Sequence, residues 1–446
     1  MDFVPLTAED RRAMLEKIGV GSFEDLLKGI PRAIPKADLN LPPGLSEPEL
    51  LEEAHRRADQ DVSSRSHVSF LGAGAYDHFI PSAVRYIGSR GEFLTAYTPY
   101  QPEASQGTLQ AMYEFQSLLC DVTGMEAANA SLYDGASALA EACLLALRET
   151  QRSKLLVAGT LHPEFRQTLQ TYLSQAPVPI AELPRRQGAS DLEAAQAQID
   201  DQTAALVVQM PNAFGGLEPV EEMGRLAQAR GALFIVVVNP ISLGILEPPG
   251  AYGADVVVGE GQSLGNDLNF GGPYLGLFAC REKFLRRMPG RIVGMTRDAH
   301  GRRGFVLTLQ TREQHIRRAK ATSNICTNEA MMALSAAVYL ASLGRNGFRE
   351  VALQNLQKAH YAFDQLTQVR GVRPLFEGPF FNEFALEVPG DPEELNGKLL
   401  KKGFLGGFPL KRWDPQLKNG WLVAVTEARS RDQIDRFSAA VREALS

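Results

Sequence analysis

The sequence predicts an α/β fold with a large domain, followed by a smaller C-terminal α+β domain. Five short β-rich runs are apolar on both faces and alternate with helix-like stretches, which is typical of a parallel or mixed sheet covered on both sides. After about residue 325 the pattern changes to a long helix, then strand, helix, strand and a final helix. The five runs are KLLVAG (154–159), AALVVQM (204–210), LFIVVVN (233–239), DVVVGEG (255–261) and YLGLFAC (274–280).

The composition is that of a globular chain. Its 446 residues are 44% hydrophobic and 22% charged, which excludes disordered and fibrous proteins. The net charge of −6 predicts no nucleic-acid partner. The longest apolar run, from Ala232 to Val238, is too short to span a membrane, and the first residues lack the pattern of a signal peptide. We therefore expect a cytoplasmic protein without a membrane partner.

The four cysteines are far apart and have no metal-ligand spacing. We therefore expect no metal site, no disulfide framework and a reducing compartment, with the thiols buried and inert. The cysteines are Cys120, Cys143, Cys280 and Cys326.

The N-terminal segment, residues 1–75, is expected to form short helices and an extended arm. Thr7, Ser22 and Ser46 are each followed by an acid three residues later, as in a capping box. Residues 30–45 are rich in proline, which forbids a regular element. Such an arm would wrap a neighbouring subunit or lie on its own domain, and the sequence leaves both open.

The large domain is placed at residues 76–325. It begins with two helical stretches, 105–124 and 136–150, and the first of these ends at Gly124. The helical spacing of the first stretch is carried by Leu109, Met112, Gln116 and Leu119.

The small domain is placed at residues 326–446. Its expected strands are NEFALEV (382–388) and WLVAVTE (421–427), and its last helix begins near Arg431.

The clearest candidate ligand site is the start of the second helix. Gly135, Ala136 and Ser137 open this helix, where free N–H groups and the helix dipole favour an anion such as phosphate. Asp134 just before them is typical of an N-cap, and local sequence alone favours capping. Further along the chain, one strand ends on Asn239 and another leads into the Gly-rich loop 259–272.

The order of these features resembles the large domain of fold-type I pyridoxal-phosphate enzymes, the aminotransferase fold. The resemblance implies that His162 stands where a side chain stacks on the pyridine ring. It also implies that Asn239 replaces the aspartate that pairs with the pyridinium nitrogen. The lysine position, eleven residues before Pro273, holds Gln262, which cannot form a Schiff base. The cofactor cup, formed by 135–137 with these three residues, is therefore expected to be degenerate.

Longer segments resemble the P-protein of the glycine cleavage system. They are FLGAGAYDHFIPSAV (70–84), EFLTAYTPYQPEASQGTLQAMYEFQ (92–116), ANASLYDGASALAEA (128–142) and TREQHIRRAKATSNICT (311–327). Chain length and the missing lysine resemble the N-terminal half of this family, in the form that is split into two chains.

This resemblance implies a subunit of glycine dehydrogenase (aminomethyl-transferring). Glycine would condense with pyridoxal phosphate and lose carbon dioxide, and the aminomethyl group would pass to the lipoyl arm of H-protein. The cofactor would be bound covalently by the partner, subunit 2, and not by this chain. The assembly would be a heterodimer that pairs into an α2β2 heterotetramer.

An aromatic, proline-stiffened loop is the main candidate for the wall of a shared pocket. Its polar groups would bind glycine or the lipoyl arm and exclude water, although a packed strap with buried tyrosines is the alternative. The loop residues are Tyr97, Thr98, Tyr100, Gln101, Glu103 and Ser105. A second cluster holds Tyr76, Asp77 and His78, and a basic run with Arg312, His315, Arg317 and Arg318 would neutralise an anion or form a solvated face.

Two other functions stay open at this point. One is an independent pyridoxal-phosphate enzyme that uses Lys320 or Lys283 for the Schiff base. The other is a purely structural scaffold that stabilises a lysine-bearing partner or docks H-protein and lines no pocket.

Overall fold

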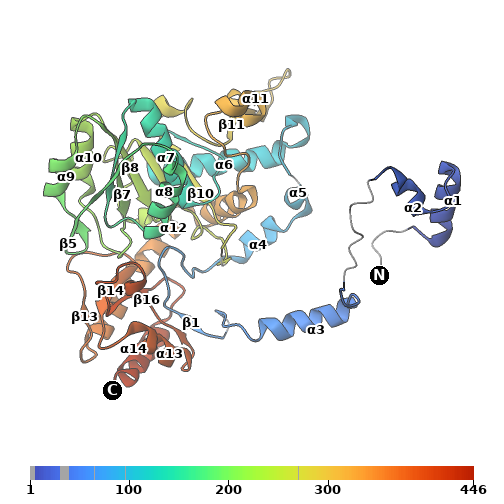
Figure 1. Ribbon diagram of the computed structural model, residues 1–446. Helices are drawn as coiled ribbons and strands as arrows, with labels where there is room; N and C mark the ends of the chain where they lie inside the picture. The colour runs from blue at the N-terminus through green and yellow to red at the C-terminus, as the bar shows by residue number, and fades with distance from the viewer. Residues whose placement is uncertain (1–5, 31–39, 65, 96, 270) are drawn as a thin grey trace. The chain divides into compact units, whose positions relative to one another are not determined.

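The computed structural model describes residues 6–30, 40–64, 66–95, 97–269 and 271–446 (Figure 1). The chain divides into two compact units, Met1–Ser66 and His67–Ser446. All strands found among the described residues belong to the second unit. The boundaries that we place at residues 75 and 325 are not decided by this division and stay predictions.

The first unit consists of short helices. Thr7, Ser22 and Ser46 each form a capping box, which confirms the three predicted helix starts. None of these helices contains a buried residue. Most of the proline-rich arm falls at 31–39, outside the described residues. The elements are α1 (Ala8–Ile18), α2 (Phe23–Leu26), η1 (Leu27–Gly29) and α3 (Glu47–Ala58).

A seven-stranded mixed sheet forms the centre of the second unit. Its order is β2-β10-β9-β8-β7-β3-β4; β10 is antiparallel to both β2 and β9, and the pairs from β9 to β4 are parallel. All five predicted strands lie in it, which confirms the α/β prediction. The strands are β2 (Ala127–Ala128), β3 (Lys154–Ala158), β4 (Ile180–Leu183), β7 (Thr203–Met210), β8 (Leu233–Val238), β9 (Val256–Glu260) and β10 (Gly276–Cys280).

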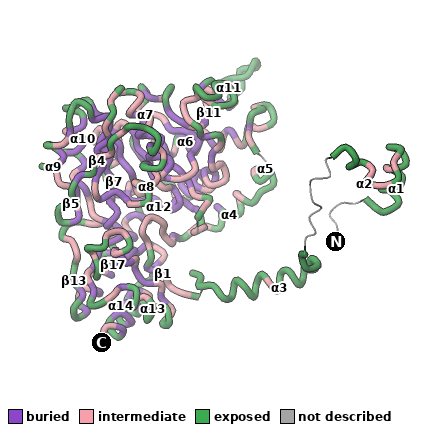
Figure 2. Tube along the Cα trace, in the orientation of Figure 1, coloured by how far each residue is buried: buried purple, intermediate pink, exposed green. Residues whose placement is uncertain are grey.

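Helices cover both faces of this sheet because alternate side chains of each strand point to opposite sides. Leu206 and Val208 pack into one apolar cluster together with residues of α6, α10 and α12, whereas Val207 packs into a second cluster with α7 and α8. The buried interior is continuous around the sheet in Figure 2. The covering helices are α6 (Gln106–Thr123), α7 (Gly135–Thr150), α8 (Pro163–Leu173), α9 (Leu192–Gln198), α10 (Val220–Ala229) and α12 (Ala330–Thr367).

A smaller four-stranded sheet, β13-β14-β17-β16, has its own core with the last helices. Phe70 joins this core and stacks on Phe437, with ring centroids 3.8 Å apart, so a segment near the start of the second unit packs among C-terminal elements. The elements are β1 (Val68–Ser69), which pairs with β15 (Phe404–Leu405), β13 (Arg373–Pro374), β14 (Glu383–Glu387), β16 (Phe408–Pro409), β17 (Gly420–Ala424), α13 (Pro392–Leu400), η7 (Leu410–Arg412) and α14 (Arg431–Ala444).

The remaining elements lie in the connections between strands and helices. Among the described residues, no helix is both long and apolar enough to cross a bilayer. The connecting elements are α4 (Ser82–Gly88), α5 (Gly91–Leu94), η2 (Pro102–Ala104), β5 (Arg185–Arg186), β6 (Ala189–Ser190), η3 (Pro240–Gly244), η4 (Glu282–Phe284), β11 (Ile292–Arg297), β12 (Arg303–Thr308), η5 (Gln310–Arg312), α11 (Gln314–Arg317) and η6 (Arg318–Lys320).

Candidate functional site

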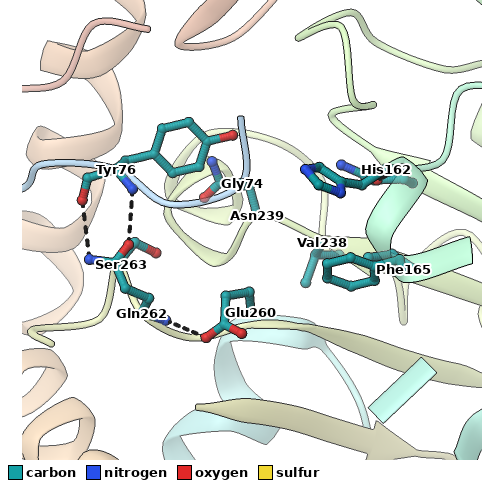
Figure 3. A pocket seen from close by; sticks show the side chains of 11 residues that line it. Gly74, Tyr76, His162, Phe165, Val238, Asn239, Glu260, Gln262 and Ser263 are labelled. Atoms are coloured by element: carbon teal, nitrogen blue, oxygen red, sulfur yellow. Dashed lines mark hydrogen bonds between the residues drawn. The ribbon is translucent and has the colours of Figure 1, made fainter. Parts of the chain in front are cut away.

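A small cavity lies at the carboxyl ends of the parallel strands, where α/β proteins usually bind their ligands. Its volume of about 40 Å³ leaves room for only a few water molecules. Figure 3 shows the side chains that surround it. The lining residues are Gly74, Tyr76, His162, Phe165, Gln209, Val237, Val238, Asn239, Glu260, Gln262 and Ser263.

The N-terminus of α7, the predicted anion cup, is satisfied by carboxylates of the chain itself. Asp134 accepts a hydrogen bond from the backbone N–H of Ser137 at 2.7 Å, which confirms that Asp134 caps this helix. The N–H of Gly135 donates to Oε2 of Glu260 at 3.0 Å. Two of the N–H groups that would hold a phosphate, those of Gly135 and Ser137, are therefore already used within the chain.

Glu260, which we had not singled out from the sequence, takes the place of an anion. Its carboxylate accepts three backbone hydrogen bonds, from Gly135, Gln262 and Leu275, each 3.0 Å long. Burial outweighs these bonds and raises the pKa of Glu260 to about 7. An acid at the end of the apolar run DVVVGEG is the sequence feature that would have revealed it.

Gln262 is hydrogen-bonded on both sides of its amide. Its Oε1 accepts from the backbone N–H of Tyr76 at 3.0 Å, and its Nε2 donates to the carbonyl oxygen of Tyr76 at 3.1 Å (Figure 3). The same Nε2 also donates to the carbonyl oxygen of Asn266 at 2.9 Å. The side chain thus holds residue 76 much as a neighbouring strand would. Gln262 is 2% exposed, so it has no free group to offer a ligand.

His162 and Asn239 are also engaged within the chain. Nε2 of His162 lies 2.9 Å from the carbonyl oxygen of Ala73. The rings of His162 and Trp413 pack edge to face, with their centroids 4.7 Å apart. Burial lowers the pKa of His162. Oδ1 of Asn239 accepts from the N–H of Ile241 at 3.1 Å. Both side chains line the cavity while they make these contacts within the chain.

Residues 72–79, which we call the covering segment, border the cavity through Gly74 and Tyr76. The N–H of Ala73 donates to Oε1 of Glu383 at 2.7 Å, and the hydroxyl of Tyr76 donates to Oε2 of the same carboxylate at 2.9 Å. Burial raises the pKa of Glu383 to about 7. Asp77 forms an ion pair with Arg429.

The covering segment continues into a second buried contact at His78. Nδ1 of His78 lies 2.8 Å from Oε2 of Glu427, whose other oxygen accepts from the N–H of Phe79 at 2.7 Å. Burial acts to raise the pKa of Glu427, but His78 and the hydrogen bonds from Phe79 and Asn355 lower it to about 2. Of the cluster formed by Tyr76, Asp77 and His78, Tyr76 lines the strand-end cavity, whereas His78 contacts Glu427.

Taken together, these contacts do not fit pyridoxal phosphate in this chain. The expected anion position holds Glu260, the position at which we expect a lysine in relatives holds Gln262, and Gly74 and Tyr76 of the covering segment line the same small cavity.

The aromatic loop lies away from the cavity and is partly open to solvent. The side chain of Tyr97 is 90% exposed and that of Tyr100 is 48% exposed. The hydroxyl of Tyr100 accepts a hydrogen bond from the buried Arg291 at 3.2 Å, and its ring lies 5.8 Å from that of His315. Of the other loop residues, Gln101 and Glu103 are exposed, and Thr98 and Ser105 are half-buried. The candidate residues thus form two separate groups.

Other candidates from the sequence have ordinary structural surroundings. Lys283 pairs with Asp255 at 2.9 Å, and Lys320 is exposed; neither lines the cavity. Arg312 is buried and donates to the carbonyl oxygens of Met288 and Gly290, so it neither faces solvent nor offers charge to an anion. For Arg312, both predictions for the basic run, an anion-binding residue and a solvated helix face, are wrong, because its guanidinium binds backbone carbonyl groups.

The expectation that all four thiols are buried is met only in part. Cys143 and Cys280 are buried, and burial raises the pKa of Cys280 to about 12. Cys120 is half-buried with a pKa raised by burial to about 11. Cys326 is exposed, so for this residue the prediction of a buried thiol is wrong.

The sheet order, the helix start at the strand ends and the separate C-terminal sheet define the class of fold-type I pyridoxal-phosphate enzymes. Sphingosine-1-phosphate lyase of Burkholderia pseudomallei K96243 shares the fold, with a TM-score of 0.66 and 16% identity over 92% of this chain and 93% of that chain. A cysteine desulfurase from Thermococcus onnurineus NA1 has a TM-score of 0.63 and 17% identity, over 87% and 98% of the two chains.

More similar relatives narrow the class to one family. The family model of the glycine cleavage system P-protein matches residues 1–441, and the chain belongs to this family. The "probable glycine dehydrogenase (decarboxylating) subunit 1" of Desulfitobacterium hafniense is 51% identical over 99% of this chain and 100% of its own length. Its counterpart in Carboxydothermus hydrogenoformans is 52% identical over 98% of each chain. An inhibitor-bound glycine decarboxylase (P-protein) of the glycine cleavage system superposes with a TM-score of 0.94 and 47% identity, covering both chains fully.

Proposed function

We propose that this chain is the non-lysine subunit of a two-chain glycine decarboxylase. The observation that carries the proposal is Gln262, a buried amide at the lysine position whose hydrogen-bonding groups are already used by the chain. Relatives of the same length that are named subunit 1 support a division of the enzyme into two chains. The lysine then comes from the partner, subunit 2.

Pyridoxal phosphate held by the partner supplies an electron sink while glycine loses carbon dioxide. This chain contributes part of the wall around the reacting groups. Tyr97 and Tyr100 are exposed in the single chain, and Arg291 holds the hydroxyl of Tyr100 in place. On assembly, these side chains would exclude water and position the glycine carboxylate or the lipoyl arm of H-protein.

We infer that the first unit serves as an arm that binds the partner. Its described helices bury no residue, yet they expose Ile18 at 58% and Phe23 at 62%. Such apolar side chains favour contact with another surface. Pairing of two heterodimers into an α2β2 assembly belongs to the same proposal.

The proposal is tested by removing the two loop hydroxyls in the assembled enzyme. We expect Tyr97→Phe and Tyr100→Phe each to lower turnover by about ten-fold, because polar contacts in the pocket wall position the reacting groups. Cofactor binding should persist, since the cofactor belongs to the partner. Glycine decarboxylation and cofactor absorbance are measured on the same samples.

Tyr361→Phe is the matched control, because it removes a tyrosine hydroxyl that donates to Asp435 at 2.6 Å in the C-terminal region. Unchanged turnover in the two loop variants would mean that the loop is a structural strap. If the loop variants weakened assembly with subunit 2 but left the turnover of the assembled enzyme unchanged, the chain would be a structural scaffold that lines no pocket.

A further inference from the structure

A dense group of basic residues follows the large sheet. Residues 286–320 contain ten arginines and lysines but only two acids, although the whole chain carries a net charge of −6. Two of the ten, Arg291 and Arg312, are buried. Strands β11 and β12 form a hairpin. We call the exposed basic residues of these two strands and of the segment after them the basic surface. It consists of Arg297, Arg303, Arg317, Arg318 and Lys320, on β11, β12, α11 and η6 (Figure 1).

The chain does not neutralise this charge itself. Arg297 and Arg303 stand directly opposite each other in the register of the hairpin. Like charges that face each other across two strands destabilise a sheet. The acid at the hairpin tip, Asp298, pairs with Arg302 at 2.8 Å, and no ion pair within the described part of the chain involves any residue of the basic surface. The surface is thus kept positive at a cost to the hairpin.

Apolar side chains lie within the same hairpin and segment. Met295 on β11 is 55% exposed, and Ile316 on α11 is 50% exposed. Exposed apolar groups among charged ones are typical of a surface that binds another protein.

The basic surface borders the aromatic loop. The ring of His315 on α11 lies 5.8 Å from that of Tyr100. At the other end of the loop, the amide of Gln106 bonds both the N–H and the carbonyl oxygen of Phe305 on β12, each at 2.8 Å. A protein bound to the basic surface would therefore lie next to the proposed pocket wall.

We propose that the basic surface docks an acidic face of the lipoyl-bearing H-protein, so that its arm reaches the pocket beside Tyr97 and Tyr100. This inference rests on the proposed function. Permanent subunit interfaces are depleted of charge at their centre, whereas a carrier that arrives and leaves in each cycle gains from electrostatic steering. A surface of arginines without ion pairs is therefore better suited to binding H-protein than to the permanent interface with subunit 2.

The test uses the chain assembled with its partner subunit and lipoylated H-protein as the probe. Arg303→Glu and Arg317→Glu, singly and combined, are compared with the wild type for H-protein affinity at low and high salt. The double variant should bind about ten-fold more weakly at low salt and show a shallower salt dependence. Arg442→Glu on α14, at the far end of the second unit in Figure 1, is the matched control and should bind normally.

The melting temperature separates docking from folding. Arg303→Glu replaces a like-charged cross-strand pair by an opposite one, so it should leave the melting temperature unchanged or raise it. Weaker docking without lost stability is the expected combination.

Equal affinity of the wild type and the double variant for H-protein would overturn the inference. Failure of the double variant to co-elute with the partner subunit would also overturn it, because the surface would then face that subunit. Glycine decarboxylation with free lipoamide in place of H-protein tests the proposed function separately. If the wild-type assembly fails in that assay, the proposed function falls, while the affinity comparison still decides the docking surface.

Discussion

Two side chains, Gln262 and Glu260, decide what the strand-end cavity can do. Glu260 places a carboxylate where the start of α7 would receive a phosphate, and Gln262 uses its amide to hold Tyr76 and Asn266. Gln262 is buried and Glu260 is half-buried, and both are surrounded by groups that satisfy their hydrogen bonds. A buried polar group with all partners in place is costly to replace, so the same bonds that stabilise these side chains also fix the shape of the cavity.

Restoring a lysine at the position of Gln262 should not restore cofactor chemistry. We expect Gln262→Lys to lower the free energy of unfolding by about 3 kcal/mol, because it removes three hydrogen bonds and buries a charge. The variant should also form no borohydride-reducible adduct with pyridoxal phosphate. Urea unfolding and mass analysis check the two outcomes, with the exposed Gln368→Lys as control; a labelled residue 262 would contradict the account.

Glu383 predicts a specific dependence of stability on pH. Burial raises the pKa of Glu383 from its ordinary value of 4.5 to about 7, so between these pH values the folded chain holds a proton that the unfolded chain has lost. The free energy of unfolding should therefore fall as pH rises from 4.5 to 7, by up to about 3 kcal/mol from this group.

Glu383→Gln should flatten that dependence. The amide can still accept from Ala73 and can donate to the hydroxyl of Tyr76, which removes the titration while keeping the contacts. Urea unfolding at several pH values measures the slope, and the exposed Glu377→Gln serves as control. The same slope in wild type and Glu383→Gln would show that Glu383 is ionised in the folded chain at neutral pH.

At the scale of elements, the sequence predicts the strands well and the cavity poorly. The strands of the large sheet are apolar on both faces and bounded by turns, so local pattern alone identifies them. The covering segment has no such pattern, because its bonds join residues as far apart as Tyr76 and Gln262, or Ala73 and Glu383. Contacts of this kind depend on the completed fold, and so does the burial that raises the pKa of Glu260 and Glu383.

The first unit should become resistant to protease when the partner binds. Its described helices bury no residue, so in the single chain we expect trypsin to cut them rapidly. Mixing with the partner subunit should slow cleavage at least about ten-fold, because ordered, covered backbone is a poor substrate. Serum albumin in place of the partner controls for competition. Equal cleavage rates with and without the partner would show that the first unit does not bind the partner.

At the scale of the whole molecule, fold and chemistry are separated. The chain keeps the large sheet, the helix that begins at the strand ends and the C-terminal sheet of a fold-type I enzyme. The side chains at its expected cofactor cup form internal hydrogen bonds, and the chain exposes an aromatic loop and a basic surface. We interpret this as a division of labour in which one chain performs the chemistry and this one shapes its surroundings.

The most direct test of this account is to find which chain carries the cofactor. Pyridoxal phosphate is added to this chain alone and to its mixture with subunit 2, followed by borohydride reduction and mass analysis of each chain. The account predicts a reduced adduct on subunit 2 and none on this chain in either sample. A reduced adduct on this chain, at Lys283, Lys320 or any other lysine, would contradict it and make the chain an independent pyridoxal-phosphate enzyme.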